Sequence, residues 1–394
     1  MKKLTLLIAS LWLLLSGCSP GFQKDEKIVK DTSDSKESAV VPKYSISDEY
    51  YKTLIPFQKG AARGLVVQGL NSRLDMDEFE TGLMRIAQKT FSTKNYLFQE
   101  GQYLDKRTAQ LLVERKRTDA QQAELEKKLN KKVPNIGLNP VLEENAAGTA
   151  EEKNAKSPIY ISNILEHNYL VKKSDNKVEL GGVVIGLAMN SVHYFNTEQG
   201  YPREQQISVE ESLAQGKKMA QTVLELLRKK DELKNVPIII AIYRQEAKSS
   251  LVPGNLLAYT KVDKGDETAD DWESVDEKYY LFPSDEASKN YREDAMKVSN
   301  FRSDLSEYFP DDFTAVVGRG FYKDGQLQEL KISIPVQFNG KAEIIGFTQY
   351  VTGLVMEHFP NYIKVEVNIY SVNNPEAVIT RDVDQEEPVV HIFS

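Results

Sequence analysis

The residue with the most specific chemistry in this sequence is Cys18, its single cysteine. Cys18 follows Leu15-Ser16-Gly17, at the end of an apolar run, residues 4–15, that begins behind two lysines. This run is shorter than the ~20 apolar residues that span a bilayer, and it is typical of the apolar core of a signal peptide. We therefore expect a diacylglyceryl group on the Cys18 thiol and cleavage of the bond between Gly17 and Cys18.

Two other interpretations of this segment are an ordinary signal peptide with an incidental cysteine and an uncleaved anchor helix. A secreted chain normally pairs its cysteines or lacks them, so a lone cysteine at this place is best explained as a lipid acceptor. The partners in maturation are then prolipoprotein diacylglyceryl transferase, which modifies Cys18, and signal peptidase II, which removes the signal peptide, residues 1–17. Two acyl chains anchor a protein stably, so we expect the mature chain to be lipid-anchored at the extracellular face of the cell membrane.

The composition of the chain argues against some partners and divides the rest of the sequence. The chain has 50 Lys and Arg against 58 Asp and Glu, a formal net charge of −8. An acidic chain is a poor match for nucleic acid or for an anionic lipid surface, so we assign the anchoring to the lipid alone. Residues 18–45 are polar and nearly free of aromatic side chains, which predicts a flexible tether with a span of roughly 30 Å. Residues 46–394 then form the folded body.

Other residue types that carry out catalysis or bind metals are widely spaced. The four histidines include no pair three or four residues apart and no HExxH motif, and the chain has no GxSxG motif. Asp270-Asp271 and Asp311-Asp312 are candidates for binding a cation or for general-acid chemistry, but acidic pairs of this kind are more typical of solvated loops. The sequence therefore predicts no catalytic residue, no metal ligand and no cofactor, in a chain that is not an enzyme.

Two arginines are candidate ligand-contacting residues, Arg63 and Arg319. Arg319 lies in Gly318-Arg319-Gly320, which lacks the Lys-Ser/Thr of a phosphate-binding loop and does not begin a helix. We interpret this tripeptide as part of a strand with a bulge or a close backbone approach. The 19 tyrosines are candidates for lining a groove for a peptide or glycan, although tyrosine also favours β-strands in general.

The spacing of apolar side chains predicts the elements that position these residues. An N-terminal helical region includes a helix from about 105 to 130. Two later segments, about 157–265 and 310–394, each have the order strand, strand, helix, strand, strand, and Ser208 begins the first of these helices in a capping box. We expect an α+β fold with two similar units of this kind. Residues 133–158 are expected to be disordered, with a lid as the alternative.

Four segments of the body carry a resemblance to a known family. They are Ala62-Arg63-Gly64 and residues 79–84 (FETGLM), 96–104 (YLFQEGQYL) and 181–190 (GGVVIGLAMN). On these residues the sequence resembles the CamS family, the sex-pheromone precursor lipoproteins of Gram-positive Firmicutes. The resemblance implies two copies of a structural repeat in the body. It also implies a second product, because the tail of the signal peptide can be trimmed and released as a short hydrophobic signalling peptide.

Residues 11–17 (LWLLLSG) would supply that peptide here, and they differ from the Ile-Leu-Ala-Ser ending of the family's known peptide. The function we predict is a surface-anchored lipoprotein of the Gram-positive cell envelope whose leader doubles as a peptide source. The alternative is an envelope lipoprotein whose body binds a wall peptide or glycan. A third hypothesis, an envelope hydrolase, needs clustered carboxylates or a histidine-based pair in the fold.

Overall fold

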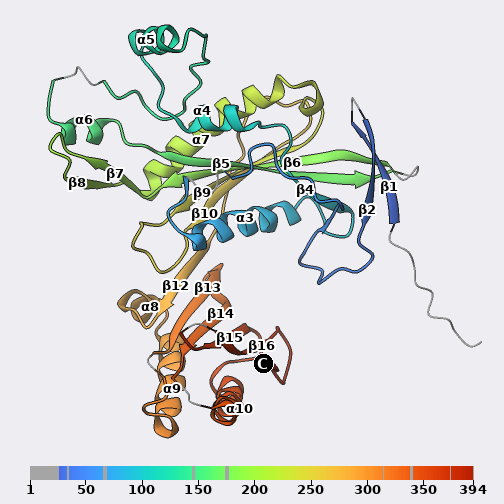
Figure 1. Ribbon diagram of the computed structural model, residues 1–394, viewed down its shortest axis with the longest axis vertical. Coiled ribbons are helices and arrows are strands. Elements are labelled where there is room, and N and C mark those ends of the chain that lie inside the picture. The colour runs from blue at the N-terminus through green and yellow to red at the C-terminus, as the bar shows by residue number, and fades with distance from the viewer. Residues whose placement is uncertain are drawn as a thin grey trace, which may run out of the picture.

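The computed structural model describes residues 26–32, 35–64, 69–143, 147–173, 177–313, 315–337, 340–372 and 374–393. The predicted signal peptide, with Gly17 and Cys18, lies outside the described residues. The chain forms two main β-sheets with helices packed on them, and Figure 1 shows the larger sheet above the smaller one. This arrangement confirms the predicted α+β class.

The larger sheet has the strand order β11-β10-β9-β6-β5-β4-β3, and the β1–β2 hairpin joins it at β6. Its longest strands, β5 and β6, pair antiparallel, and β9 pairs parallel with β6. The strands are β1 (Glu26–Thr32), β2 (Ser35–Val41), β3 (Lys52–Thr53), β4 (Tyr96–Glu100), β5 (Ile161–Lys172), β6 (Lys177–Asn190), β9 (Ile238–Gln245), β10 (Asn255–Val262) and β11 (Glu273–Ser274).

Helices cover both faces of the larger sheet. α3 (Arg73–Gln88) packs on one face through Phe79 and Leu83, which are fully buried. β6 passes beneath it at Gly186, where a Cβ would lie 2.6 Å from the side chains of Phe79 and Leu83, so this position needs glycine. α4 (Lys106–Val113) and α7 (Val209–Arg228) pack on the opposite face, as Figure 1 shows.

The smaller sheet has the order β12-β13-β14-β15-β16-β17. α9 (Arg292–Tyr308) and α10 (Lys341–His358) pack on one of its faces, with Phe301 and Phe347 fully buried in the shared core. The strands, and the short helix before α9, are β12 (Glu277–Phe282), α8 (Asp285–Asn290), β13 (Val317–Lys323), β14 (Gln326–Pro335), β15 (Lys364–Tyr370), β16 (Pro375–Arg381) and β17 (Val389–Ile392).

The two predicted units share one topology, except that in the first unit the paired strands β7 (Val192–Asn196) and β8 (Pro202–Gln206) lie between β6 and α7. In the larger sheet β5 and β6 form an antiparallel pair, α7 follows, β9 returns parallel to β6, and β10 is antiparallel to β9. In the smaller sheet β13 and β14, α10, β15 and β16 repeat this order and these directions. α7 begins at the predicted cap Ser208, whose side chain accepts a hydrogen bond from the N–H of Glu211.

The structure differs from the tether that was expected over residues 18–45 in the described part of that range, while residues 18–25 and 33–34 lie outside the described residues. From Glu26 to Val41 the chain forms the β1–β2 hairpin. Ala39 and Val41 are buried with Leu54 and with side chains of β5 and β6. This apolar end of β2 gains more from burial than the polar composition of the whole segment indicates, since each buried side chain of this kind contributes about 1 kcal/mol or more.

Two further expectations were wrong. The helix expected from about 105 to 130 is two helices, α4 and α5 (Asp119–Leu129), because the chain becomes extended at Glu114. Residues 133–158 were expected to be disordered, yet in the described part of this range, residues 133–143 and 147–158, Asn139 is fully buried and its amide donates to the backbone oxygens of Val113 and Ile161. Residues 144–146 lie outside the described residues. The remaining described elements are α6 (Ala150–Lys156), β7 (Val192–Asn196), β8 (Pro202–Gln206) and the 3₁₀ helix η1 (Asp231–Leu233). Among the described residues, every helix is too short or too polar to span a bilayer.

Candidate functional site

The two candidate arginines lie in different parts of the molecule. Arg63 lies in a turn, half exposed, with Nη1 3.8 Å from Oε1 of Glu100 and its guanidinium over the ring of Phe57. Arg319 lies on β13 of the smaller sheet. The interpretation of its flanking glycines is supported at Gly320, where a Cβ would lie 2.9 Å from a buried phenylalanine of β12. The structure does not place the two arginines in one site, and their contact with a ligand stays a prediction.

The family-like segment 96–104 wraps around one carboxylate. Glu166 on β5 is buried, and its carboxylate accepts hydrogen bonds from the backbone N–H groups of residues 102–104. Gly101 fits against it so closely that a Cβ would lie 2.4 Å from Cβ of Glu166. Burial raises the pKa of Glu166, and the N–H donors act in the opposite direction. Both oxygens of this carboxylate accept from backbone donors, so Glu166 holds the part of the segment that follows β4 in place.

A buried ion-pair cluster joins the two sheets. Arg85 on α3 pairs with Glu78 on the same helix and with Glu277 at the start of β12, where Nη2 lies 2.7 Å from Oε2. Its guanidinium lies 4.8 Å from the ring centroid of Phe321, and the hydroxyl of Tyr279 donates to Glu78. Burial alone lowers the pKa of Arg85, but the two carboxylates reverse this and raise it, so Arg85 stays charged. The cluster holds the smaller sheet against α3.

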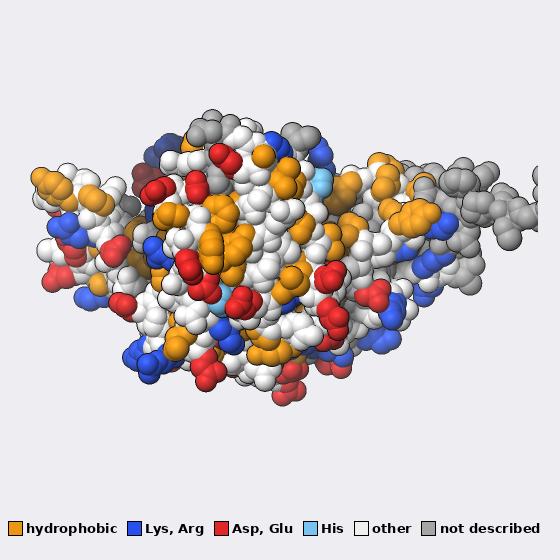
Figure 2. Space-filling view, turned by 90° about the horizontal axis from the view of Figure 1, so that it is seen from below, with side chains coloured by type: hydrophobic (Ala, Val, Ile, Leu, Met, Phe, Trp, Pro, Cys, Tyr) orange, Lys and Arg blue, Asp and Glu red, His pale blue; other side chains and the backbone are white. Residues whose placement is uncertain are grey.

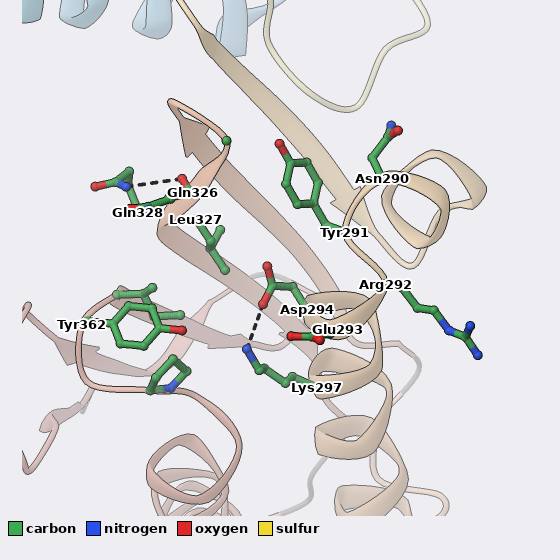
Figure 3. Close-up of a pocket in the computed structure, with 13 residues that line it drawn as sticks. Asn290, Tyr291, Arg292, Glu293, Asp294, Lys297, Gln326, Leu327, Gln328 and Tyr362 are labelled. Atoms are coloured by element: carbon green, nitrogen blue, oxygen red, sulfur yellow. Dashed lines mark hydrogen bonds and ion pairs between the residues drawn. The ribbon is translucent and has the colours of Figure 1, made fainter.

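A cavity of about 710 Å³ opens in the unit of the smaller sheet. It lies between the start of α9, the β13–β14 turn and the loop that follows α10 (Figure 3). We call it the tyrosine pocket, and the side chains that characterise it are Tyr291, Asp294, Lys297, Gln326 and Tyr362. Its size falls within the range of ~300–1,000 Å³ that is usual for small-ligand sites.

Charged and aromatic groups are combined in this pocket. Figure 3 shows Asp294 and Lys297 turned toward its centre and Arg292 turned away. Asp294 accepts hydrogen bonds from Lys297 at 2.9 Å and from the hydroxyl of Tyr322 at 2.8 Å. The ring of Tyr291 stacks on that of Tyr322 with the centroids 3.7 Å apart. Burial raises the pKa of Tyr322, and the carboxylate of Asp294 raises it further, so the phenol stays protonated and donates.

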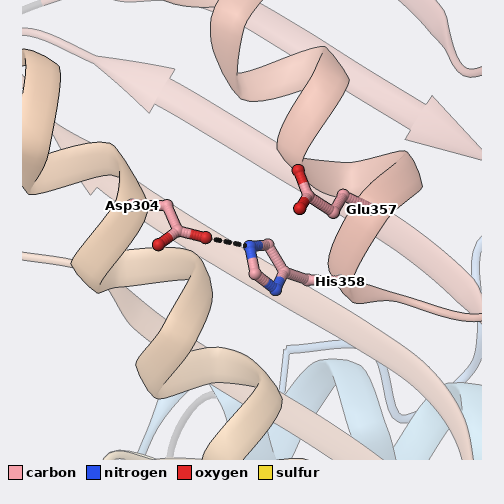
Figure 4. A group of neighbouring side chains, drawn as sticks. All are labelled: Asp304, Glu357 and His358. Atoms are coloured by element: carbon pink, nitrogen blue, oxygen red, sulfur yellow. Dashed lines mark hydrogen bonds and ion pairs between the residues drawn. The ribbon is translucent and has the colours of Figure 1, made fainter.

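Three side chains with metal-ligand atoms meet where α9 and α10 run side by side. They are Asp304 on α9 and Glu357 and His358 at the end of α10, and their nearest ligand atoms all lie within 4.8 Å of one another. Nε2 of His358 is 2.7 Å from Oδ2 of Asp304, while Glu357 is exposed beside them (Figure 4). We call these residues the histidine–carboxylate cluster. Asp304 and His358 are 54 residues apart in the sequence, so a pattern of closely spaced histidines does not reveal it.

The surface at the end of the smaller sheet carries no single type of side chain. Figure 2 views this end of the molecule and shows hydrophobic side chains near the centre, with acidic and basic ones mixed around them. On α9 and α10 the exposed apolar side chains include Tyr308, Ile345 and Met356. A mixed surface of this kind agrees with the modest net charge of the chain.

The sequence analysis did not predict the ion-pair cluster, the tyrosine pocket or the histidine–carboxylate cluster. Arg85 and Glu277 meet only because β12 packs on α3, and no local pattern predicts that contact. The one signal for the tyrosine pocket was the abundance of tyrosine, which does not say that Tyr291 and Tyr322 stack. The segment 96–104 was found, but only as a resemblance, because its partner Glu166 lies in a different strand.

The sequence and the fold of this chain are similar to those of known proteins. The sequence model of the CamS sex pheromone cAM373 precursor family matches residues 57–387 of this chain. The C-terminal domain of the sex pheromone staph-cAM373 precursor from Staphylococcus aureus is 33% identical, with a TM-score of 0.69 over 83% of this chain and 99% of that one. The sex pheromone precursor from Lactobacillus salivarius subsp. salivarius UCC118 is 30% identical, with a TM-score of 0.79 over 90% of this chain and 98% of that one. None of the curated proteins matches the chain.

Proposed function

Because the chain belongs to the CamS sex pheromone cAM373 precursor family, we propose that it is a lipoprotein precursor with two products. One product is a short hydrophobic peptide from the tail of the leader, residues 11–17. The other is the folded body, held at the outer face of the membrane by a diacylglyceryl group on Cys18. The observation that carries this proposal is Leu15-Ser16-Gly17-Cys18, with Cys18 as the single cysteine of the chain.

The chemistry of maturation assigns a role to each residue of this motif. Prolipoprotein diacylglyceryl transferase moves the diacylglyceryl group of a membrane phospholipid to the Cys18 sulfur. A thioether C–S bond forms, the C–O bond to the phosphate breaks, the thiol loses its proton, and the phosphate headgroup leaves. Signal peptidase II then hydrolyses the Gly17–Cys18 peptide bond, and the small side chains of Ser16 and Gly17 leave that bond accessible. Two acyl chains give stable anchoring, which one chain does not. The released leader is the source of the peptide after further trimming.

The start of the β1–β2 hairpin sets how far the body stands from the lipid. Residues 19–25 separate Cys18 from Glu26, the first residue of β1. Even fully extended, this stretch of chain spans at most about 28 Å. The hairpin pairs with β6, so that end of the larger sheet stays near the membrane surface. This arrangement leaves less freedom than a tether that runs to residue 45.

Expression in a Gram-positive host tests the proposal. We expect the wild-type chain in the membrane fraction, where it carries a metabolic lipid label. In the medium we expect a leader fragment that ends at Gly17 or a shorter fragment trimmed from it. Cys18→Ala should lose the label and leave the leader attached. Lipid label on the Cys18→Ala chain would contradict the anchor, and a medium without any fragment of residues 4–17 from the wild type would contradict the peptide product.

As a second function we propose that the body binds a wall peptide or glycan in the tyrosine pocket. The observation that favours it is the pairing of an aromatic wall, Tyr291 and Tyr362, with the charged pair Asp294 and Lys297 in one cavity. Aromatic faces pack against the C–H face of a sugar or an apolar side chain, while the charges bind hydroxyl, amine or carboxylate groups. Both stem peptides and wall glycans carry such groups.

Muropeptides from a muramidase digest are the probe for this second function. Tyr362→Ala should weaken their binding, measured by calorimetry, because Tyr362 lies at the pocket and is 63% exposed. Tyr308→Ala is the matched control, since Tyr308 has the same exposure on the same unit and does not line the pocket. Stem peptide without glycan separates the two ligand classes. Equal binding by both variants would place the ligand elsewhere, and no heat with any fragment would contradict this function.

A further inference from the structure

The histidine–carboxylate cluster brings one nitrogen and two oxygen ligands from two helices to one place. Asp304 comes from α9, and Glu357 and His358 come from the last turn of α10. The helices are held together here independently of these ligands, because the Tyr350 hydroxyl donates to the backbone oxygen of Asp304 at 3.2 Å. The cluster is therefore assembled on packed helices and not on a loop.

The surroundings of the cluster suit a cation with solvent access. The His358 side chain is only 12% exposed and packs edge-on against Phe301 with the ring centroids 6.2 Å apart. The Asp304 side chain is 41% exposed and Glu357 is exposed, so one side of the group is open to water. An apolar inner side fixes the imidazole, and an open outer side leaves room for water ligands.

The local charge is negative and not balanced by a basic side chain. In the described part of the chain, no lysine or arginine nitrogen lies within 4.0 Å of the carboxylate of Asp304 or Glu357. Glu307, one turn after Asp304, adds a further negative charge near the hydroxyl of Tyr350. A divalent cation would bring positive charge to this acidic group.

The distances are close to those of a metal site. Nitrogen and oxygen ligands lie 2.0–2.2 Å from zinc, so tetrahedral ligands are roughly 3.3–3.6 Å apart. The His358–Asp304 separation of 2.7 Å must open by roughly 0.6–0.9 Å, and a separation at the cluster limit of 4.8 Å must close by roughly 1.2–1.5 Å. Rotation of the exposed Glu357 side chain supplies this second movement. The metal would then lie between His358 and Asp304, in place of their direct hydrogen bond.

We propose that Asp304, Glu357 and His358 form a binding site for a divalent transition metal, zinc by its ligand set, with water completing the coordination. Imidazole with carboxylate favours zinc over magnesium or calcium, which prefer oxygen ligands alone. Metal at this place would link α9 to α10 and stiffen the helical face of the smaller sheet. Nothing in the proposed functions of the leader or of the tyrosine pocket requires this site.

Titration of the chelator-treated full chain in detergent with zinc chloride tests the proposal. Calorimetry should show one zinc ion for each chain, and cobalt should give the visible absorption bands of a four- or five-coordinate site. His358→Gln should weaken zinc binding by more than the ~10–100-fold that loss of an outer-shell partner costs. His391→Gln is the control, because His391 is an exposed histidine on β17 outside the cluster, and it should bind zinc as the wild type does.

A second variant separates metal binding from folding. The contact between Asp304 and His358 also joins the helices without metal, so its loss alone lowers stability. Glu357→Gln keeps that contact and removes one ligand at an exposed position. We expect it to weaken zinc binding at least ~10-fold while the melting temperature of the metal-free chain stays unchanged. Equal zinc affinity in the wild type and both cluster variants, or no zinc binding by the wild type, would overturn the proposal.

Discussion

Gly101→Ala is a direct test of how the segment 96–104 is held. An alanine Cβ at this position would lie 2.4 Å from Cβ and 2.6 Å from the backbone oxygen of Glu166. The backbone oxygen belongs to β5, which is paired on both sides, so it cannot move away cheaply. The substitution must instead push residues 101–104 away from the strand. The N–H groups of residues 102–104 then lose alignment with the buried carboxylate.

The expected cost is the sum of an overpacking penalty and of the hydrogen bonds that break. Overpacking of a tight site costs ~1–3 kcal/mol. The hydrogen bond from the Gly101 N–H to the Glu166 backbone oxygen, 2.9 Å long, contributes about 1 kcal/mol, and a hydrogen bond to the buried carboxylate about 2 kcal/mol. If one hydrogen bond to the carboxylate breaks, Gly101→Ala lowers the free energy of unfolding by about 5 kcal/mol. Breaking the bonds from all three N–H groups would cost more.

Urea unfolding of the mature chain measures this cost, with the fluorescence of Trp272 as the reporter because Trp272 packs against the core of the larger sheet. Gly346→Ala is the matched control. Gly346 lies within α10, where nothing is within 4 Å of an added Cβ, so alanine should stabilise the chain by ~0.5–1 kcal/mol. If Gly101→Ala costs under about 1 kcal/mol, the close approach to Glu166 does not exist in solution and the reasoning is wrong.

Three other predictions concern buried polar groups. Arg85→Met leaves two buried carboxylates without their cation and should cost about 3–5 kcal/mol in urea unfolding, whereas a cost under about 1 kcal/mol would mean that the pairs are solvated. Burial lowers the pKa of His167 to about 3 and that of His193, with a smaller effect of Arg115, to about 4. As the pH falls, these histidines are therefore protonated in the unfolded chain before they are protonated in the folded chain. Each histidine then lowers the free energy of unfolding by about 1.4 kcal/mol per pH unit between pH ~6 and ~4. In His167→Gln the slope of the free energy of unfolding against pH should be shallower by about 1.4 kcal/mol per pH unit. An unchanged slope would contradict the burial of His167. The Tyr169 hydroxyl has no hydrogen-bond partner among the described residues, so Tyr169→Phe should raise the free energy of thermal unfolding by roughly 1 kcal/mol, and a loss of that size would reveal a hidden partner.

Much of the fold follows from local signals in the sequence. Ser208 caps α7 as predicted, because its side chain accepts from the N–H of Glu211 at the helix start. The predicted capping box is only half formed, since the Glu211 side chain accepts from the hydroxyl of Tyr160 instead. Runs of β-branched residues predict β6 and β9, which are buried on both faces beneath α3 and α7. The repeated unit could be found because both copies keep the same order of such signals.

The rest depends on contacts between distant residues. The β1–β2 hairpin was missed because its polar composition hides the few apolar side chains that Ala39 and Val41 contribute. The partner of the segment 96–104 is a single glutamate in β5, and no spacing rule connects them. The tyrosine pocket and the histidine–carboxylate cluster both lie where α9 meets elements that follow it in the chain. Only the packing of the smaller sheet brings those side chains together.

The mass of the mature amino terminus tests the central proposal most directly. Tryptic peptides from the membrane-bound chain can be extracted into organic solvent and measured by mass spectrometry. We predict an amino-terminal peptide that begins at Cys18 and carries the mass of a diacylglyceryl group, with no peptide that spans the Gly17–Cys18 bond. An unmodified Cys18, or a mature chain that begins at another residue, would contradict the proposal.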